Sequence, residues 1–155
     1  MPFYPEQERT KMAIKTGAEI NFESGSALKI AGSQVTSSAA QLNDDVLTLD
    51  IVDASAEAVY YMLCPYAGTI TKIWTVIDSA VLTADVTLTA AIGATAVTTG
   101  VVTITQAGSA AGDIDSATPT ALNVVTAGQA VNLTVTGGGA AGTGPRIHVT
   151  MVITH

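Results

Sequence analysis

The sequence is poor in charge, in aromatic residues and in cysteine. Only 12% of its 155 residues are charged, whereas about a quarter are charged in an ordinary soluble domain. The single cysteine, Cys64, has no partner for an internal disulfide, so nothing in the chain requires an oxidising compartment. The thirteen acidic residues outnumber the six basic ones, which argues against binding to the phosphates of nucleic acids.

Long hydrophobic runs are also missing, although 48% of the residues are hydrophobic. Threonine interrupts the apolar runs well before the roughly 18 residues that would suggest a membrane-spanning helix. The first residues lack the basic end and apolar stretch of a secretory signal peptide, so we expect a cytoplasmic site of synthesis. Between residues 86 and 145 the only acidic or basic residues are Asp113 and Asp115, which disfavours catalysis. We predict no enzymatic activity and no cofactor.

An uneven distribution of charge divides the chain into three parts. Four of the six basic residues lie among the first 30 residues, and Arg146 is the only strong cation beyond Lys72. A chain of 155 residues has room for one domain and an appendage. We predict an N-terminal arm over residues 1–16, a stem of short strands over residues 17–45 and a β-sandwich domain over residues 46–155.

The arm combines two aromatic residues with a run of mixed charge. Pro2 and Pro5 favour an extended start of the chain. Aromatic side chains bury apolar area on a partner, and charged side chains set the register of the contact. The arm either contacts a partner in this way or folds back on its own domain. The predicted contact residues are Phe3, Tyr4, Glu6, Glu8, Arg9, Lys11 and Lys15.

The stem is built from a short repeat. Its three units open with Gly17, Gly25 and Gly32, and each continues with alternating apolar residues. Strands this short leave an apolar face exposed, because a two-stranded hairpin is marginally stable in water. We predict that copies from neighbouring subunits cover that face; the alternative is a meander packed on the main domain. The predicted interface residues are Ile20, Phe22, Leu28, Ile30 and Val35.

From residue 46 onward, apolar and polar residues alternate with the period of two that is typical of β-strands. Glycine and other turn residues separate the alternating runs, and no convincing amphipathic helix follows residue 45. We predict an all-β domain of eight or nine strands, an antiparallel sandwich of jelly-roll type. The expected strands cover about residues 46–51, 59–63, 69–77, 86–90, 102–104, 122–124, 131–135 and 147–153.

Residues that often carry chemistry are interpreted here as structural. Cys64 ends an apolar strand, which predicts a buried thiol rather than a nucleophile. His148 and His155 do not complete the three or four ligands of a metal site. The Asp-x-Asp spacing of Asp113 and Asp115 lacks the further oxygen ligands of a calcium loop, so a solvated acidic loop is expected. We predict no metal site.

Two further patterns are also assigned to structure. The glycine-rich stretch Gly137–Pro145 lacks the Lys-Ser/Thr and the helix of a phosphate-binding loop, so it is a connection between the last two strands. Trp74 shares its alternation with Ile70 and Val76, which predicts a core tryptophan. The alternative is a sugar-stacking platform of Trp74 with Tyr60, Tyr61 and Tyr66.

One segment resembles a known family. Ser24–Gly32, followed by Val35–Asn43, resembles a segment common in tailed-phage fibre and head-fibre proteins. In those proteins a glycine-rich short-strand repeat leads into Val-Thr-x-x-Ala-Ala-Glu-Leu-Asn, and here Gln41 stands where glutamate is usual. The Ala-, Thr-, Val- and Gly-rich remainder resembles the β-domain of phage capsid decoration (cement) and head-fibre proteins.

The resemblance implies a non-enzymatic virion protein, commonly a homotrimer, on the outer surface of a capsid. The implied partner is the major capsid protein, and neither nucleic acid nor a membrane is expected as a partner. The arm is then the contact with the capsid. The alternative is a tail-fibre or host-surface carbohydrate-binding module with recognition in the loops 107–119 and 137–145, which lack aromatic residues.

Overall fold

The computed structural model describes residues 29–30, 33–34, 44–81, 83–139, 142 and 144–155. The chain divides into two units, residues 1–36 and residues 37–155, and each is described by itself. In the first unit two short strands, β1 (Lys29–Ile30) and β2 (Ser33–Gln34), pair in antiparallel fashion. β1 falls within the second predicted repeat of the stem.

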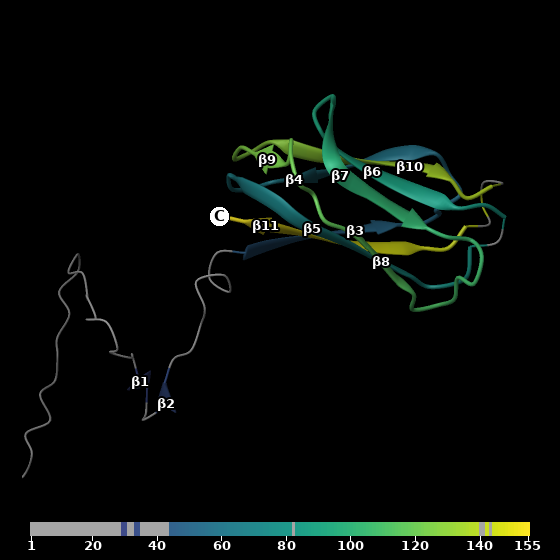
Figure 1. Cartoon of the computed structure of the whole chain (residues 1–155), viewed down its shortest axis with the longest axis horizontal. Helices are drawn as coiled ribbons and strands as arrows, with labels where there is room; N and C mark the ends of the chain where they lie inside the picture. The colour runs from purple at the N-terminus through teal and green to yellow at the C-terminus, as the bar shows by residue number, and fades with distance from the viewer. Residues whose placement is uncertain (1–28, 31–32, 35–43, 82, 140–141, 143) are drawn as a thin grey trace, which may run out of the picture. The chain divides into compact units, whose positions relative to one another are not determined.

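The second unit is an antiparallel β-sandwich, which confirms the predicted fold class (Figure 1). One sheet contains β3 (Asp44–Ile51), β11 (Ile147–Thr154), β5 (Gly68–Ile77) and β8 (Ile114–Ala117) in this order, and β9 (Val124–Val125) also pairs with β5. The other sheet contains β4 (Ala58–Leu63), β10 (Ala130–Gly137), β6 (Val86–Ile92) and β7 (Thr95–Ile104) in this order. The described residues include no helix, and hence none long and apolar enough to cross a membrane.

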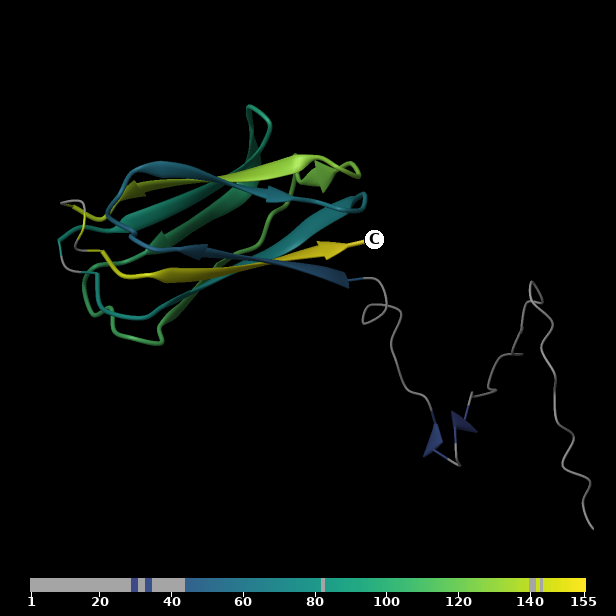
Figure 2. The same ribbon diagram turned by 180° about the vertical axis from the view of Figure 1, so that it is seen from behind.

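Apart from β9, the strands of the sandwich pair as if one long hairpin had been folded over on itself. β3 pairs with β11, β4 with β10, β5 with β8 and β6 with β7. The first and last strands therefore lie side by side, and Asp44 and His155 lie at the same end of the sandwich (Figure 2). We call this the entry end. The opposite end, called the far end, carries the loops 52–57, 78–85, 105–113 and 138–146.

The core lies between the two sheets and is almost entirely aliphatic. Inward positions alternate with outward threonine, asparagine and histidine along β10 and β11. Full burial of a side chain such as leucine or isoleucine contributes about 1.5–3 kcal/mol. The largest fully buried side chains include Ile51, Ile70, Ile73, Ile77, Leu88, Ile104, Leu133, Ile147, Met151 and Ile153.

A bulge in β5 exchanges the two faces of that strand. Lys72 and Ile70 pair with consecutive residues of β11, so Thr71 is the extra residue. Ile70 is buried, but beyond the bulge the buried positions are odd-numbered, beginning with Ile73. Trp74 therefore faces outward and is 39% exposed. The prediction of a core tryptophan is wrong, because it assumed an unbroken alternation from Ile70 onward.

Several strands also differ from the prediction, most of all β7, which begins at Thr95 and not at residue 102. β3 begins at Asp44, two residues before the predicted domain boundary. β8 was not predicted, because its four residues follow directly on an acidic turn and pair only with β5. The strand expected over residues 122–124 is reduced to β9, because Leu122 has a φ of 53° and so cannot continue a strand.

Candidate functional site

The predicted contact residues of the arm and most of those of the stem lie outside the described residues. Among them, only Ile30 is described, in β1. The residues that lie outside are Phe3, Tyr4, Glu6, Glu8, Arg9, Lys11, Lys15, Ile20, Phe22, Leu28 and Val35. Candidate chemistry in the described chain therefore belongs to the sandwich.

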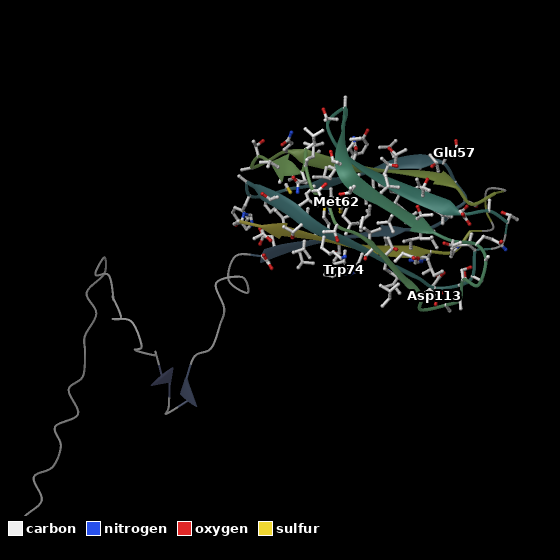
Figure 3. The ribbon with its side chains drawn as sticks, in the orientation of Figure 1. Glu57, Met62, Trp74 and Asp113 are labelled. Carbon is white, nitrogen blue, oxygen red and sulfur yellow. The ribbon has the colours of Figure 1, made fainter. Side chains whose placement is uncertain are left out.

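Acidic side chains gather in the loops of the far end. Figure 3 shows Glu57 and Asp113 at this end of the sandwich. Arg146 is the only basic residue in the four loops. The acidic residues of these loops are Asp53, Glu57, Asp78, Asp85 and Asp113.

The carboxylate of Asp53 joins two of these loops. Its Oδ1 accepts hydrogen bonds from the backbone N–H and the hydroxyl of Ser55, at 2.9 and 2.5 Å, and from Gly144 N–H at 3.0 Å. Its Oδ2 accepts from Gly142 N–H at 2.6 Å. These bonds, led by the Ser55 hydroxyl, lower the pKa of Asp53. A Cβ on Gly144 would lie 2.6 Å from Asp53 Oδ1, so this contact requires glycine.

Three other aspartates of the far end make the same kind of contact. Asp78, Asp85 and Asp113 each accept a hydrogen bond from the backbone of a loop residue. The donors are the N–H groups of Arg146 at 2.8 Å, Gln106 at 2.7 Å and Ala110 at 2.7 Å. A hydrogen bond to an ionised carboxylate is about twice as strong as a neutral one. These carboxylates therefore stabilise the loops of the far end through hydrogen bonds to their backbone.

A hollow of about 200 Å³ lies between the end of β7 and the start of β8, lined in part by Ser109, Asp113 and Asp115. Burial raises the pKa of Asp115, and the negative charge of Asp113 adds to the rise. Asp113 belongs to the expected acidic loop, but Asp115 lies in β8, so that prediction is only half right. Within the described residues, no three side chains of the histidine, cysteine, aspartate or glutamate type are grouped to hold a metal ion.

Both histidines pair with acidic residues of β3. His148 faces outward as predicted, with Nδ1 at 2.6 Å from Asp50 Oδ1. His155 Nε2 lies 2.9 Å from Asp45 Oδ2, and its Nδ1 contacts the carbonyl oxygen of Ala67. The hydrogen bonds to Asp45 and then to Ala67 raise the pKa of His155. Because both ring nitrogens face acceptors, the doubly protonated ring satisfies both contacts.

Cys64 is fully buried, which confirms a structural thiol. Burial raises its pKa, and the charge of Asp45 acts in the same direction. The thiolate is the nucleophilic form of cysteine, so a raised pKa disfavours reactivity. The backbone of Cys64 continues the pairing of β4 through bonds with Gln129 O at 2.9 Å and Gly128 N at 2.8 Å.

The four aromatic residues of the sandwich do not form one platform. Trp74 lies on the outer face of its sheet, with the amine of Lys72 at 5.6 Å from its ring centroid. Tyr61 lies on the outer face of the other sheet, and Tyr60 points inward beside it. Tyr66 is exposed in the turn after β4. The alternative of a joint sugar-stacking platform is therefore wrong, although Trp74 itself is accessible.

A feature that we did not predict is the apolar outer row of β4. Val59, Tyr61 and Leu63 are 45%, 66% and 64% exposed and follow one another on the outward face. β4 carries no charged side chain. The signal in the sequence is that the run Ala58–Leu63 contains no threonine or charged residue at its outward positions, unlike most other strands.

No family model matches the chain, and no curated protein matches it in sequence. Function is therefore inferred from the segment 24–43 and from the arrangement of side chains described above.

Proposed function

We propose that this chain is a structural virion protein that decorates and stabilises the outer surface of a phage capsid. It acts as a homotrimer bound to the major capsid protein, without enzymatic activity and without nucleic acid or a membrane as partner. It assembles onto the virion in the host cytoplasm. The observation that carries the proposal is the segment 24–43, which resembles head-fibre proteins and leads directly into a β-sandwich at Asp44.

The arm is the proposed anchor. Phe3 and Tyr4 bury apolar area on the shell, and the charged residues from Glu6 to Lys15 pair with complementary charges that fix the register. The sandwich is a poor candidate for such pairing, because it holds nine of the thirteen acidic residues and only two of the six basic ones. We place its acidic far end toward the solvent, where like charge keeps neighbouring virions apart.

The hydrogen bonds of Asp45, Asp50 and Asp53 weigh against a catalytic pair formed by these residues, which leaves Asp113 and Asp115 at the hollow as the pair to test. The rival enzyme class is a virion glycan hydrolase, which needs two carboxyl groups about 5–9.5 Å apart, one as acid and one as base or nucleophile. Asp53 already accepts four hydrogen bonds. Asp45 and Asp50 contact histidines, and Asp113 accepts a backbone N–H.

We also assign the sandwich to the jelly-roll class. Its four hairpin pairs, β3 with β11, β4 with β10, β5 with β8 and β6 with β7, follow the order expected when one long hairpin is wrapped into two sheets. Double-sheet jelly rolls of eight strands are an architecture of viral capsid proteins. The assignment supports a virion role by analogy of fold alone.

Deletion of residues 2–16 tests the anchor. Shells assembled from the major capsid protein of the encoding phage are mixed with the wild-type and the truncated chain, and bound protein is measured by co-sedimentation. We expect the truncated chain to fold and to lose binding. A narrower variant, Phe3→Ala with Tyr4→Ala, is expected to weaken binding at least tenfold, because central aromatic residues dominate interface energies.

The matched control is Tyr66→Ala, which removes an exposed aromatic residue of the sandwich and leaves the arm intact. It should bind shells as the wild type does. Undiminished binding of the chain without residues 2–16 would refute the arm as anchor. Failure of the wild-type chain to bind any shell would refute the decoration role.

The outward position of Trp74 favours a second candidate function, glycan binding. An exposed tryptophan offers a flat apolar face to a sugar ring. Its neighbours across the sheet, Thr150 and Ser116, are outward hydroxyl residues. In this candidate, recognition lies on the outer face of the sheet rather than in the loops 107–119 and 137–145.

Because Trp74 is the only tryptophan, its fluorescence reports directly on this face. Titration of the full chain with host-surface glycans should leave the emission unchanged if decoration is the function. A saturable change in emission, together with binding that is lost in Trp74→Ala and kept in Tyr61→Ala, would favour the glycan-binding candidate.

A further inference from the structure

β4 is an edge strand whose free side has no partner among the described residues. It pairs only with β10, and the outer row of Val59, Tyr61 and Leu63 lies beside the free edge. Natural sheets protect such edges with charged residues, proline, bulges or a covering segment. β4 contains no charged residue and no proline, and its register with β10 is unbroken.

Among the described residues, nothing covers the side of the sandwich that carries β4. β3 is the edge strand of the other sheet on this side, and its inward residues Leu47 and Leu49 are only partly buried. Tyr60 of β4 points inward and is also only partly buried. On the opposite side, the free edge of β7 is partly paired, because Thr98 of β7 forms a bridge with Ala121. The core is therefore incomplete along β3 and β4.

Two observations identify the occupant as a second copy of this chain. The preceding segment joins the sandwich at Asp44, the first residue of β3, so copies linked through that segment are tethered to one another by their β3 strands. Charge agrees with that placement. β3 carries Asp44, Asp45 and Asp50, the last two beside histidines, so two β3 edges would bring aspartates together, whereas β4 carries no charge.

We propose that the β4 edge of each copy packs beside the β3 edge of the next, closing a ring of three. Such an interface joins two different patches of the same chain, as a cyclic trimer requires. It rests on the homotrimer of the proposed function and extends the subunit contact from the stem to the sandwich. Tyr61 is its expected centre, since exposed tyrosines are enriched at interfaces.

The test places a charge of either sign at the centre of the edge. Tyr61→Glu and Tyr61→Lys are made in the full chain, and mass is measured by light scattering over a dilution series. On dilution, the oligomer of each variant is expected to dissociate at a protein concentration at least tenfold higher than that of the wild type. The chain has a net charge of −7, so repulsion between copies would be increased by glutamate and reduced by lysine. Dissociation by both variants therefore indicates that residue 61 is buried in the interface.

The matched controls are Ile114→Glu and Ile114→Lys. Ile114 is 67% exposed on β8, against 66% for Tyr61, and lies on the other side of the sandwich. These controls should keep the wild-type mass. Circular dichroism of all four variants checks that the sandwich remains folded.

A photo-crosslinking amino acid at position 61 identifies the occupant. We expect crosslinks between differently labelled copies, mapping to β3 of the neighbour. Crosslinks to residues 17–43 of the same chain would overturn the inference. A trimer that stays stable in both Tyr61 variants would also overturn the inference, but it would remain consistent with a trimer formed by the stem. A monomeric wild type would refute both, while capsid binding is decided separately by the arm deletion.

Discussion

The two ends of the sandwich use aspartate in opposite ways. At the far end, Asp53 accepts hydrogen bonds from backbone N–H groups and a hydroxyl, and these favour its charged form. At the entry end, Asp45 contacts His155, whose own charged form is favoured. The same residue type therefore makes one end sensitive to acid and the other sensitive to base.

The signs follow from the direction of each pKa shift. The pKa of Asp53 is lowered on folding, so its stabilisation is present above the unfolded value near 4 and disappears as the pH falls through the lower folded value. The pKa of His155 is raised, so its stabilisation is present below the unfolded value near 6.5 and disappears as the pH rises through the folded value. Acid should loosen the far end, and base the entry end.

The largest expected loss of stability comes from a core substitution that affects both ends of the sandwich. Leu133 is fully buried at the middle of β10, so its packing stabilises both ends of the sandwich. Leu133→Ala should destabilise the sandwich by about 2–5 kcal/mol, measured by urea unfolding. Amide exchange should accelerate at both ends alike. If amides of the far end exchange faster while those of the entry end stay protected, the two ends unfold independently.

The next effect separates the ends. Asp53→Asn removes the charge that the loop N–H groups bind, so we expect a lower Tm at pH 7 and faster amide exchange at Gly142 and Gly144. The difference in Tm from the wild type should shrink as the pH falls below about 4 and vanish only below the lowered pKa of folded Asp53. The control is Glu57→Gln, an exposed acidic residue of the same loop. A difference that persists in acid would contradict the electrostatic cause.

A smaller loss of stability, with the opposite pH dependence, is expected at the entry end. His155→Gln removes the contact with Asp45, so its Tm should fall below that of the wild type at pH 5–6 and converge with it as the pH rises. Exchange should accelerate at residues 44–46 and not at Gly142. His148→Gln removes the other histidine–aspartate pair and serves as the comparison. Convergence in acid instead would refute the assignment.

The smallest effect is expected at the outer face between the two ends. Trp74→Ala should cost less than about 1.5 kcal/mol, because a fully buried tryptophan would cost about 3–5 kcal/mol and Trp74 is 39% exposed. Acrylamide should quench its emission readily in the native chain. Strong protection from quenching in the monomeric Tyr61→Glu variant would mean that the bulge in β5 is absent.

Alternation in the sequence was sufficient to predict the sandwich, eight of its nine strands and the inward residues of β10 and β11, but it missed β8. It failed at β5, because one extra residue at Thr71 exchanges the two faces of the strand. The mark in the sequence is Lys72, which an unbroken alternation from Ile70 would place in the core. The contacts of Asp53 with Gly142 and Gly144 were also beyond prediction, since these residues lie 89 and 91 positions further along the chain. Local patterns likewise do not reveal that the apolar run Ala58–Leu63 becomes an edge strand.

The pairing of the first strand with the last has a practical consequence for peptide display. Thr154 and Asp44 are joined by a hydrogen bond of 2.8 Å, so a sequence appended after His155 emerges beside the point where the preceding chain enters. An insertion in the loop 105–113 emerges at the far end instead. If the arm anchors the chain to a capsid as proposed, an epitope tag at the carboxyl terminus should be masked on the particle, whereas the same tag inserted next to Gly108 should remain accessible to antibody.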